Sequence, residues 1–222
     1  MEWPSVRSLL WVLVLVAHIH ESKGCIEEER MSLLELKAFL KFSTNYIKPL
    51  LPSWLNEAKS ECCGWERVMC NATTGHVIEL YLSNINQGTH VYSDNESNYY
   101  PENWFLNGSS LLTFKELRIL DLSHNGIGGW LGNEGSKSLS RLGNLETLNL
   151  ADNSFNKSFI KSLSAIKALK NLNLSWNWQG LKGSFPAQEL SALENLENLD
   201  LSSNQLNGSI TTQGNKEYRC NF

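Results

Sequence analysis

One nine-residue phrase occurs four times in this chain, with the template L-x-x-L-x-L-x-x-N. Successive copies begin 28, 24 and 27 residues apart. A repeat of this period predicts a solenoid, in which each copy is one coil and stacked coils bury a shared core. A solenoid offers a long, open surface, which favours binding over catalysis. The copies begin at Leu117, Leu145, Leu169 and Leu196, and a degenerate copy lies at 80–82.

Each phrase predicts one short strand followed by a turn. Because side chains alternate along a strand, Leu120 and Leu122 should point into the solenoid while Asp121 points out. Each buried leucine contributes roughly 1.5–3 kcal/mol to stability. We expect the asparagine that ends each phrase to turn inward and bond buried backbone groups. These residues are Asn125, Asn153, Asn177 and Asn204.

The first 24 residues have the pattern of a secretory signal. Arg7 precedes an apolar run over residues 9–17, and small residues follow up to Gly24, where we expect cleavage. The run is too short to span a membrane, although a retained anchor is an alternative. No other segment approaches membrane length, so we expect a secreted, extracellular chain. Its net charge of −4, without a basic patch, argues against nucleic acid as a partner.

Six N-x-S/T sequons agree with export. Asn173 is the exception in position, because it falls in a predicted strand where a glycan would project into the concave face. We therefore expect poor glycosylation there. The six candidate glycosylation sites are Asn71, Asn95, Asn107, Asn156, Asn173 and Asn207.

Five cysteines in an exported chain indicate disulfides. Cys62 and Cys63 are neighbours, and a bond between them would be strained. We expect the pairs Cys25–Cys62 and Cys63–Cys70, worth about 4 and about 2.5 kcal/mol in the chain-entropy model. A zinc site is the alternative, but adjacent cysteines give poor spacing for a metal. Cys220 is left over.

Between the first cysteines lies a predicted helix. Three glutamates from Glu27 begin it, and Leu33, Leu36 and Leu40 form one apolar stripe. The sequence therefore predicts an α/β repeat fold: a right-handed leucine-rich-repeat solenoid, or horseshoe, with a disulfide-stapled helical N-terminal cap. The expected segments are a signal peptide at 1–24, the cap at 25–72, about five repeats at 73–213 with an insertion at 84–114, and a non-repeat tail at 214–222.

Several motifs resemble those of plant receptor-like proteins, the kinase-less group related to tomato Cf resistance proteins. The cap resembles theirs in Trp54, in the run Cys62-Cys-x-Trp65-x-x-Val68-x-Cys70, and in Gly75-His-Val77-x-x-Leu80-x-Leu82-Ser83. The segments from Trp104 to Leu117 and from Gly129 to Gly135 resemble their first coils. The resemblance covers roughly residues 1–213.

This resemblance implies the beginning of a cell-surface receptor ectodomain for defence or developmental signalling. Such proteins bind peptide or microbial ligands and recruit co-receptor kinases. They are single-pass plasma-membrane proteins with many more repeats, so we expect a truncated form. Alternatives are a secreted inhibitor of cell-wall-degrading enzymes, similar to polygalacturonase inhibitors, and a decoy without its own ligand.

A non-catalytic binding module fits the residues better than an enzyme. The histidines after the signal (His76, His90 and His124) form no metal-ligand spacing, and no nucleophile or phosphate-loop motif occurs. We expect no cofactor and no metal. The exposed strand positions form columns that are candidates for a ligand face, in which Trp176 and His124 stand out. The candidate face comprises Tyr81, Asp121, His124, Asn149, Asp152, Asn173, Trp176 and Asp200.

The last coil lacks an obvious cover. We expect an uncovered apolar end, which favours self-association, and Cys220 as a possible cross-link. The residues of this end are Leu196, Leu199, Leu201, Leu206 and Ile210.

Overall fold

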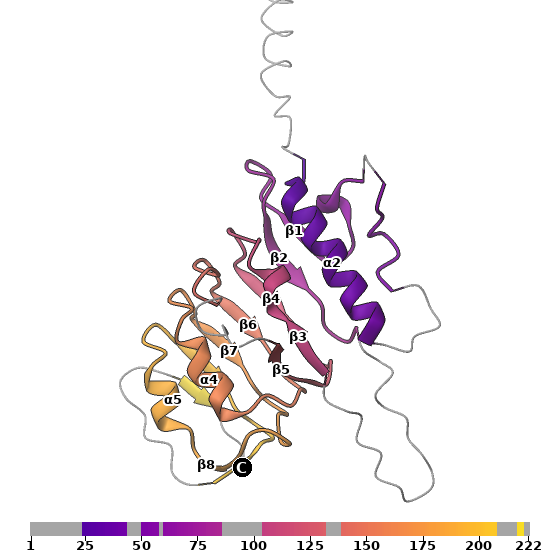
Figure 1. The fold of residues 1–222 in the computed structure, drawn as a ribbon. Coiled ribbons are helices and arrows are strands. Elements are labelled where there is room, and N and C mark those ends of the chain that lie inside the picture. Colours follow the sequence, from indigo (N-terminus) through magenta and orange to yellow (C-terminus); the bar gives the residue numbers. More distant parts are fainter. Residues whose placement is uncertain are drawn as a thin grey trace, which may run out of the picture.

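Each leucine-rich phrase forms one short strand, and the strands stack in parallel along one side of the molecule (Figure 1). A computed structural model describes residues 24–43, 50–57, 60–85, 104–131, 139–207 and 217–219. The strands of the five phrases are β2 (Val77–Tyr81), β4 (Ile119–Asp121), β6 (Thr147–Asn149), β7 (Asn171–Asn173) and β9 (Asn198–Asp200). The strand β1 (Val68–Cys70) pairs antiparallel with β2 at one end of the sheet. The predicted leucine-rich-repeat solenoid is confirmed.

The leucines occupy the interior, as the alternation predicts. Leu120, Leu148, Leu172 and Leu199 pair in register across neighbouring strands, and each is at most 2% exposed. One continuous core therefore runs through the stacked coils. A short turn leads into each strand: Leu142 N–H, for example, donates to the carbonyl of Leu139 at 3.0 Å.

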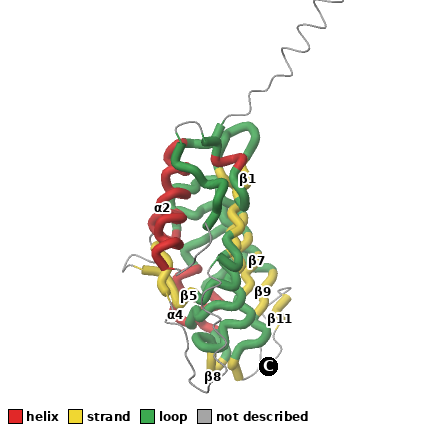
Figure 2. The backbone as a smooth tube through the Cα atoms, turned by 90° about the vertical axis from the view of Figure 1, so that its right-hand side faces the viewer, coloured by secondary structure: helices red, strands yellow, loops and turns green. Residues whose placement is uncertain are grey.

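The side of the solenoid opposite the sheet is built from short helices and two small parallel sheets (Figure 2). The helices are α4 (Lys157–Leu163), α5 (Ala187–Ser191) and the 3-10 turn η3 (Gly108–Leu111). The first small sheet joins β3 (Trp104–Asn107) to β5 (Ile127–Leu131), and the second joins β8 (Lys182–Ser184) to β10 (Gln205–Asn207). Thus β3 and η3 form the later part of the predicted insertion.

A ladder of asparagines links the coils at the end of the strands. The Nδ2 group of Asn153 donates to the carbonyls of Leu122, Leu150 and Ala151, at 3.0 to 3.2 Å. Its Oδ1 accepts from two backbone N–H groups of the preceding coil. Asn125 and Asn177 likewise donate to three carbonyls, their Oδ1 atoms accept from a backbone N–H of the preceding coil, and both are almost completely buried. The predicted inward turn of these residues is confirmed.

The fourth coil departs from the others by two additional residues. In coils two, three and five the first buried apolar residue comes two positions after the asparagine, whereas Leu181 comes four positions after Asn177. The N–H of Leu181 consequently donates to the carbonyl of Asn177 itself, at 2.7 Å. Asn204, the next rung, therefore has a buried Oδ1 without a hydrogen-bond partner in the described part of the chain.

The cap covers the first coil. Helix α2 (Glu27–Ser43) buries Leu33, Leu36 and Leu40, the predicted stripe. Glu29 is 1% exposed, and its carboxylate accepts from the backbone N–H of Val77 at 2.7 Å, which ties the helix to β2.

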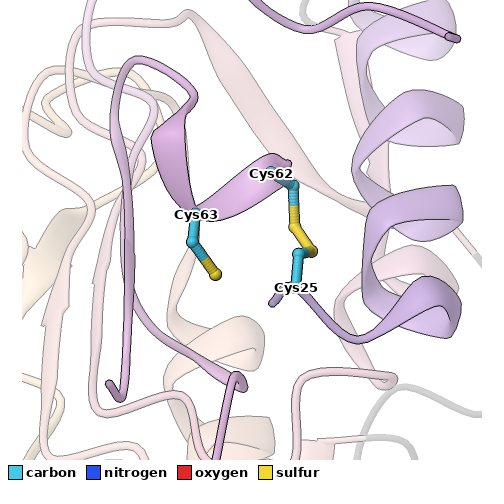
Figure 3. A group of neighbouring side chains, drawn as sticks. All are labelled: Cys25, Cys62 and Cys63. Atoms are coloured by element: carbon cyan, nitrogen blue, oxygen red, sulfur yellow. A yellow bond between two sulfur atoms is a disulfide. The ribbon is translucent and has the colours of Figure 1, made fainter. Parts of the chain in front are cut away.

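Two disulfides staple this cap, in the pairs expected from the sequence. Cys62 and Cys63 belong to the 3-10 turn η1 (Cys62–Gly64); Cys62 is bonded to Cys25, and Cys63 to Cys70. Figure 3 shows the Cys25–Cys62 bond with Cys63 beside it. The Sγ atoms of these three cysteines lie within 4.8 Å of one another. Because a metal requires thiolates, these bonded sulfurs cannot serve as ligands.

At the C-terminal end the structure adds a strand to the main sheet and buries leucines that were expected to be uncovered. Residues 217–219, placed in a non-repeat tail, form β11 (Glu217–Arg219), which pairs in parallel with β9. The tail thus supplies a further strand to the sheet, in which Tyr218 takes the register position opposite Leu199. The expectation of an uncovered apolar end was wrong, because its described leucines are at most 5% exposed. These are Leu196, Leu199, Leu201 and Leu206.

Some expectations fall outside the described residues. They concern the signal segment (apart from Gly24), the sequon at Asn95, Ile210 and Cys220.

Candidate ligand-binding face

The outward side chains of the main sheet form a surface that we call the sheet face. Its central column contains five of the predicted ligand residues, one from each of the strands β2, β4, β6, β7 and β9. Neighbours in this column are partners in the strand register, so the structure brings them together. The column runs Tyr81, Asp121, Asn149, Asn173, Asp200.

Each polar side chain of this column is held by a local hydrogen bond. The Oδ1 of Asn173 accepts from Ser175 N–H at 2.9 Å and from Ser175 Oγ at 2.7 Å. Asp121 and Asp200 bind the serine two positions later in the same way. Asn149 keeps only the backbone bond, at 3.2 Å, because Ala151 stands there. The turn therefore orients each amide or carboxylate and leaves its second polar atom available.

A hollow of about 380 Å³ lies on the sheet face across β6, β7 and β9. Its polar lining is made of amide, hydroxyl and carboxylate groups, and three leucines complete it. In the described part of the chain, the Nδ2 groups of Asn149 and Asn173 and the Oδ2 of Asp200 make no hydrogen bond. We call this site the hollow; it is lined by Thr147, Leu148, Asn149, Asn171, Leu172, Asn173, Asn198, Leu199 and Asp200.

Sequence reasoning missed the second polar row of the hollow, formed by the first residue of each strand. Asn171 donates from Nδ2 to Thr147 Oγ1 at 3.1 Å, and Asn198 donates to Asn171 Oδ1 at 2.7 Å. The signal was present, because these residues also alternate with the buried leucines. They lie next to the central column, so the face is two residues wide on each strand.

A charged pair precedes these strands and was also missed. Lys170 Nζ lies 2.8 Å from Glu146 Oε2, and both side chains are more than 40% exposed. The hydrogen bond lowers the pKa of Glu146 and raises the pKa of Lys170. Exposed pairs contribute little to stability. This pair therefore affects mainly the electrostatic surroundings of the face.

The remaining predicted residues occupy the turn that follows each strand. His124, Asp152 and Trp176 all have a left-handed backbone, with φ between 51° and 58°. His124 Nδ1 lies 2.8 Å from Asp152 Oδ2. Trp176 is 56% exposed. A bulky residue rarely adopts this conformation, and burial does not offset its cost here. These residues thus flank the end of the central column.

Tyr81 marks the cap end of the face. Its hydroxyl donates to the carboxylate of Glu79, and this hydrogen bond is the main reason that the pKa of Tyr81 is raised.

Two family models match the chain in the order of its structural elements. The Leucine rich repeat N-terminal domain matches residues 26–71. The Leucine Rich Repeat matches residues 116–140, 144–166 and 195–213. Receptor like protein 21 of Arabidopsis thaliana is 39% identical over 208 residues, which cover 91% of this chain and 20% of that protein. The chain belongs to the leucine-rich-repeat proteins, and over most of its length it is similar to plant receptor-like proteins. It spans about a fifth of the length of the curated relatives that it matches.

Solved structures share the receptor-like fold. A chain of the BIR3–SERK2 complex from Arabidopsis thaliana is 29% identical, with a TM-score of 0.57 over 84% of this chain and 93% of that chain. A chain of the Arabidopsis receptor kinase HAESA complex with the peptide hormone IDA and the co-receptor SERK1 is 24% identical. Its TM-score is 0.57, over 83% of this chain and 27% of that chain. Within the described residues, no helix combines the length and apolar character needed to cross a membrane.

Proposed function

We propose that this receptor-like chain is a non-catalytic, extracellular module that binds a protein or peptide ligand on its sheet face. The hollow carries the proposal. Its rim presents donors on Asn149 and Asn173 and an acceptor on Asp200 that make no hydrogen bond within the described residues. Groups that are already oriented bind a partner at a lower entropic cost than mobile ones.

The relatives support the class of function. Receptor-like proteins are the curated neighbours, and the solved HAESA complex contains a peptide hormone and a co-receptor. For this chain, a peptide ligand and a co-receptor kinase are therefore the proposed partners. The proposed contact surface extends beyond the hollow to the other predicted residues of the face, which are Tyr81, Asp121, His124, Asp152 and Trp176.

A displayed library of short peptides, screened against the chain produced without N-glycans, tests this function. Asn198 is exposed on the rim of the hollow, whereas Gln188 is exposed on α5, outside the sheet face. The variants Asn198→Arg and Gln188→Arg introduce the same charge and bulk at these two places. Peptides selected on the parent chain should lose binding to Asn198→Arg and keep it on Gln188→Arg.

Equal binding of the selected peptides to both variants would place the ligand elsewhere and refute the sheet face as the site. Failure to recover any peptide or protein ligand with a correctly folded chain would refute the binding function.

A further inference from the structure

Among the sequons whose asparagine lies in the described residues, one differs from the others in its place on the molecule. Asn173, Leu174 and Ser175 form it, and Asn173 lies on β7, the central strand of the three that line the hollow. Neighbouring strands in a sheet are about 4.8 Å apart, so a sugar attached here must lie over β6 or β9 as well.

The geometry of this asparagine suits a modified side chain. Its Oδ1 is fixed by the N–H and the hydroxyl of Ser175, at 2.9 and 2.7 Å. Its Nδ2 makes no hydrogen bond to any described residue, and an N-glycan is attached at that atom. A glycan would therefore leave both hydrogen bonds intact and extend from the side of the amide that bonds no described residue.

The sequence alone favours poor glycosylation at Asn173, but the engagement of Oδ1 alone reverses that expectation. We propose that Asn173 carries an N-linked glycan that occupies the hollow, so that glycosylation and ligand binding at the sheet face exclude each other. The donor is a lipid-diphosphate-linked oligosaccharide. The bond from its anomeric carbon to the phosphate oxygen breaks, a bond from that carbon to Nδ2 forms, and the lipid diphosphate leaves with the electron pair. The amide gives up one proton, which the released diphosphate or the solvent takes. Only the effect on ligand binding rests on the proposed function; the modification itself does not.

Two other sequons provide a comparison. Asn156 caps α4 outside the hollow, and its Oδ1 accepts from Ser158 Oγ at 2.6 Å, so it shares the local geometry but is exposed. In Asn71 the Nδ2 atom is already engaged, donating to Glu116 at 3.1 Å. Asn156 is thus the matched control for a glycan with the same local geometry and no hollow around it.

The chain itself offers a conservative variant. Ser175→Ala removes the sequon, and Ala151 already occupies the equivalent position in the preceding coil beside Asn149. The converse change, Ala151→Ser, creates a sequon at Asn149 on the adjacent strand of the hollow. Both variants should therefore fold, while one loses a glycan and the other gains the site for one.

The full chain is secreted from plant cells, and site occupancy is measured by glycopeptide mass spectrometry. We expect a glycan at Asn173 and the loss of one glycan mass in Ser175→Ala. A peptide-N-glycanase acting on the native chain should release the Asn173 glycan more slowly than the Asn156 glycan. The two rates should become equal after denaturation.

An unmodified Asn173 in the folded, secreted chain overturns the proposal, as does native release at the rate of Asn156. Peptides selected on Ser175→Ala should bind glycosylated parent chain weakly; equal binding also overturns it. A Ser175→Ala chain that binds no ligand while the parent carries the protected glycan refutes the binding function and leaves the modification standing.

Discussion

The asparagine ladder gives a prediction that can be graded along the chain. Asn153→Ala removes a side chain whose Nδ2 group contacts three carbonyls and whose Oδ1 accepts from two backbone N–H groups. The amide group has only two hydrogens, so its three carbonyl contacts count as two donated hydrogen bonds. With the two accepted bonds, the side chain makes four hydrogen bonds. At about 1 kcal/mol each, the substitution should cost about 4 kcal/mol.

Asn204→Ala is the matched comparison. Asn204 donates to only two carbonyls. Its Oδ1 has no partner among the described residues, because the backbone N–H of Leu181 donates to the carbonyl of Asn177 and not to Asn204. Its loss should cost about 2 kcal/mol, since two donated bonds disappear. Asn177→Ala, with three contacted carbonyls and one accepted bond, should fall between the two or close to Asn153→Ala.

Guanidinium unfolding followed by circular dichroism measures these differences, with equal transition slopes as the check that the compared states match. For a chain of this size, 2 kcal/mol corresponds to a difference of roughly 4–8 °C in Tm between Asn153→Ala and Asn204→Ala. If the two variants lose the same stability, the ladder does not derive its strength from the bonds between coils and the reasoning fails.

Further predictions concern the rest of the fold. Gly180→Ala should destabilise the chain by about 1–3 kcal/mol in thermal unfolding, because its Cβ would lie 2.3 Å from a carbonyl oxygen, whereas Gly143→Ala, with its nearest neighbour at 4.0 Å, should cost nothing. Glu29→Ala leaves a buried N–H of β2 unpaired and should cost about 1–3 kcal/mol in denaturant unfolding; no loss would contradict the tie between cap and sheet. The carboxyl of Glu146 should titrate below its usual pKa in carbon NMR, and Lys170→Met should reduce this shift, because the hydrogen bond to Lys170 is its largest cause. The stabilising effect of the Glu146–Lys170 pair is present above the unfolded-state pKa of Glu146 and is lost as pH falls through its lowered folded-state pKa.

Sequence reasoning succeeded where a pattern is repeated. The alternation of leucines identified both the strands and the buried residues, and the asparagines were predicted to turn inward because a buried bend must satisfy its backbone groups. The same alternation places Asn171 and Asn198 on the sheet face, but they were passed over for residues later in the strand. The hollow requires both rows, so only half of its rim was predicted.

The errors lie where the repeat weakens. Residues 217–219 have no L-x-L phrase, yet β11 forms because strand pairing depends on backbone hydrogen bonds, and Tyr218 can take the position that leucine holds elsewhere. The two-residue lengthening of the fourth coil was visible in the spacing from Asn177 to Leu181. Its consequence, an unpaired Oδ1 on Asn204, required the hydrogen bonds of the structure.

The turn after each strand separates the demands of folding from those of binding. All five coils need a left-handed residue there, and four of them use Asn84, His124, Asp152 or Ser203, small or polar side chains. Trp176 satisfies the same backbone requirement at a higher conformational cost and is mostly exposed. Because the fold accepts a cheaper residue in four equivalent places, the tryptophan is better explained by contact with a partner than by packing. Trp176→Asn should therefore maintain or raise stability and weaken ligand binding, whereas a loss of stability would assign this side chain to the fold.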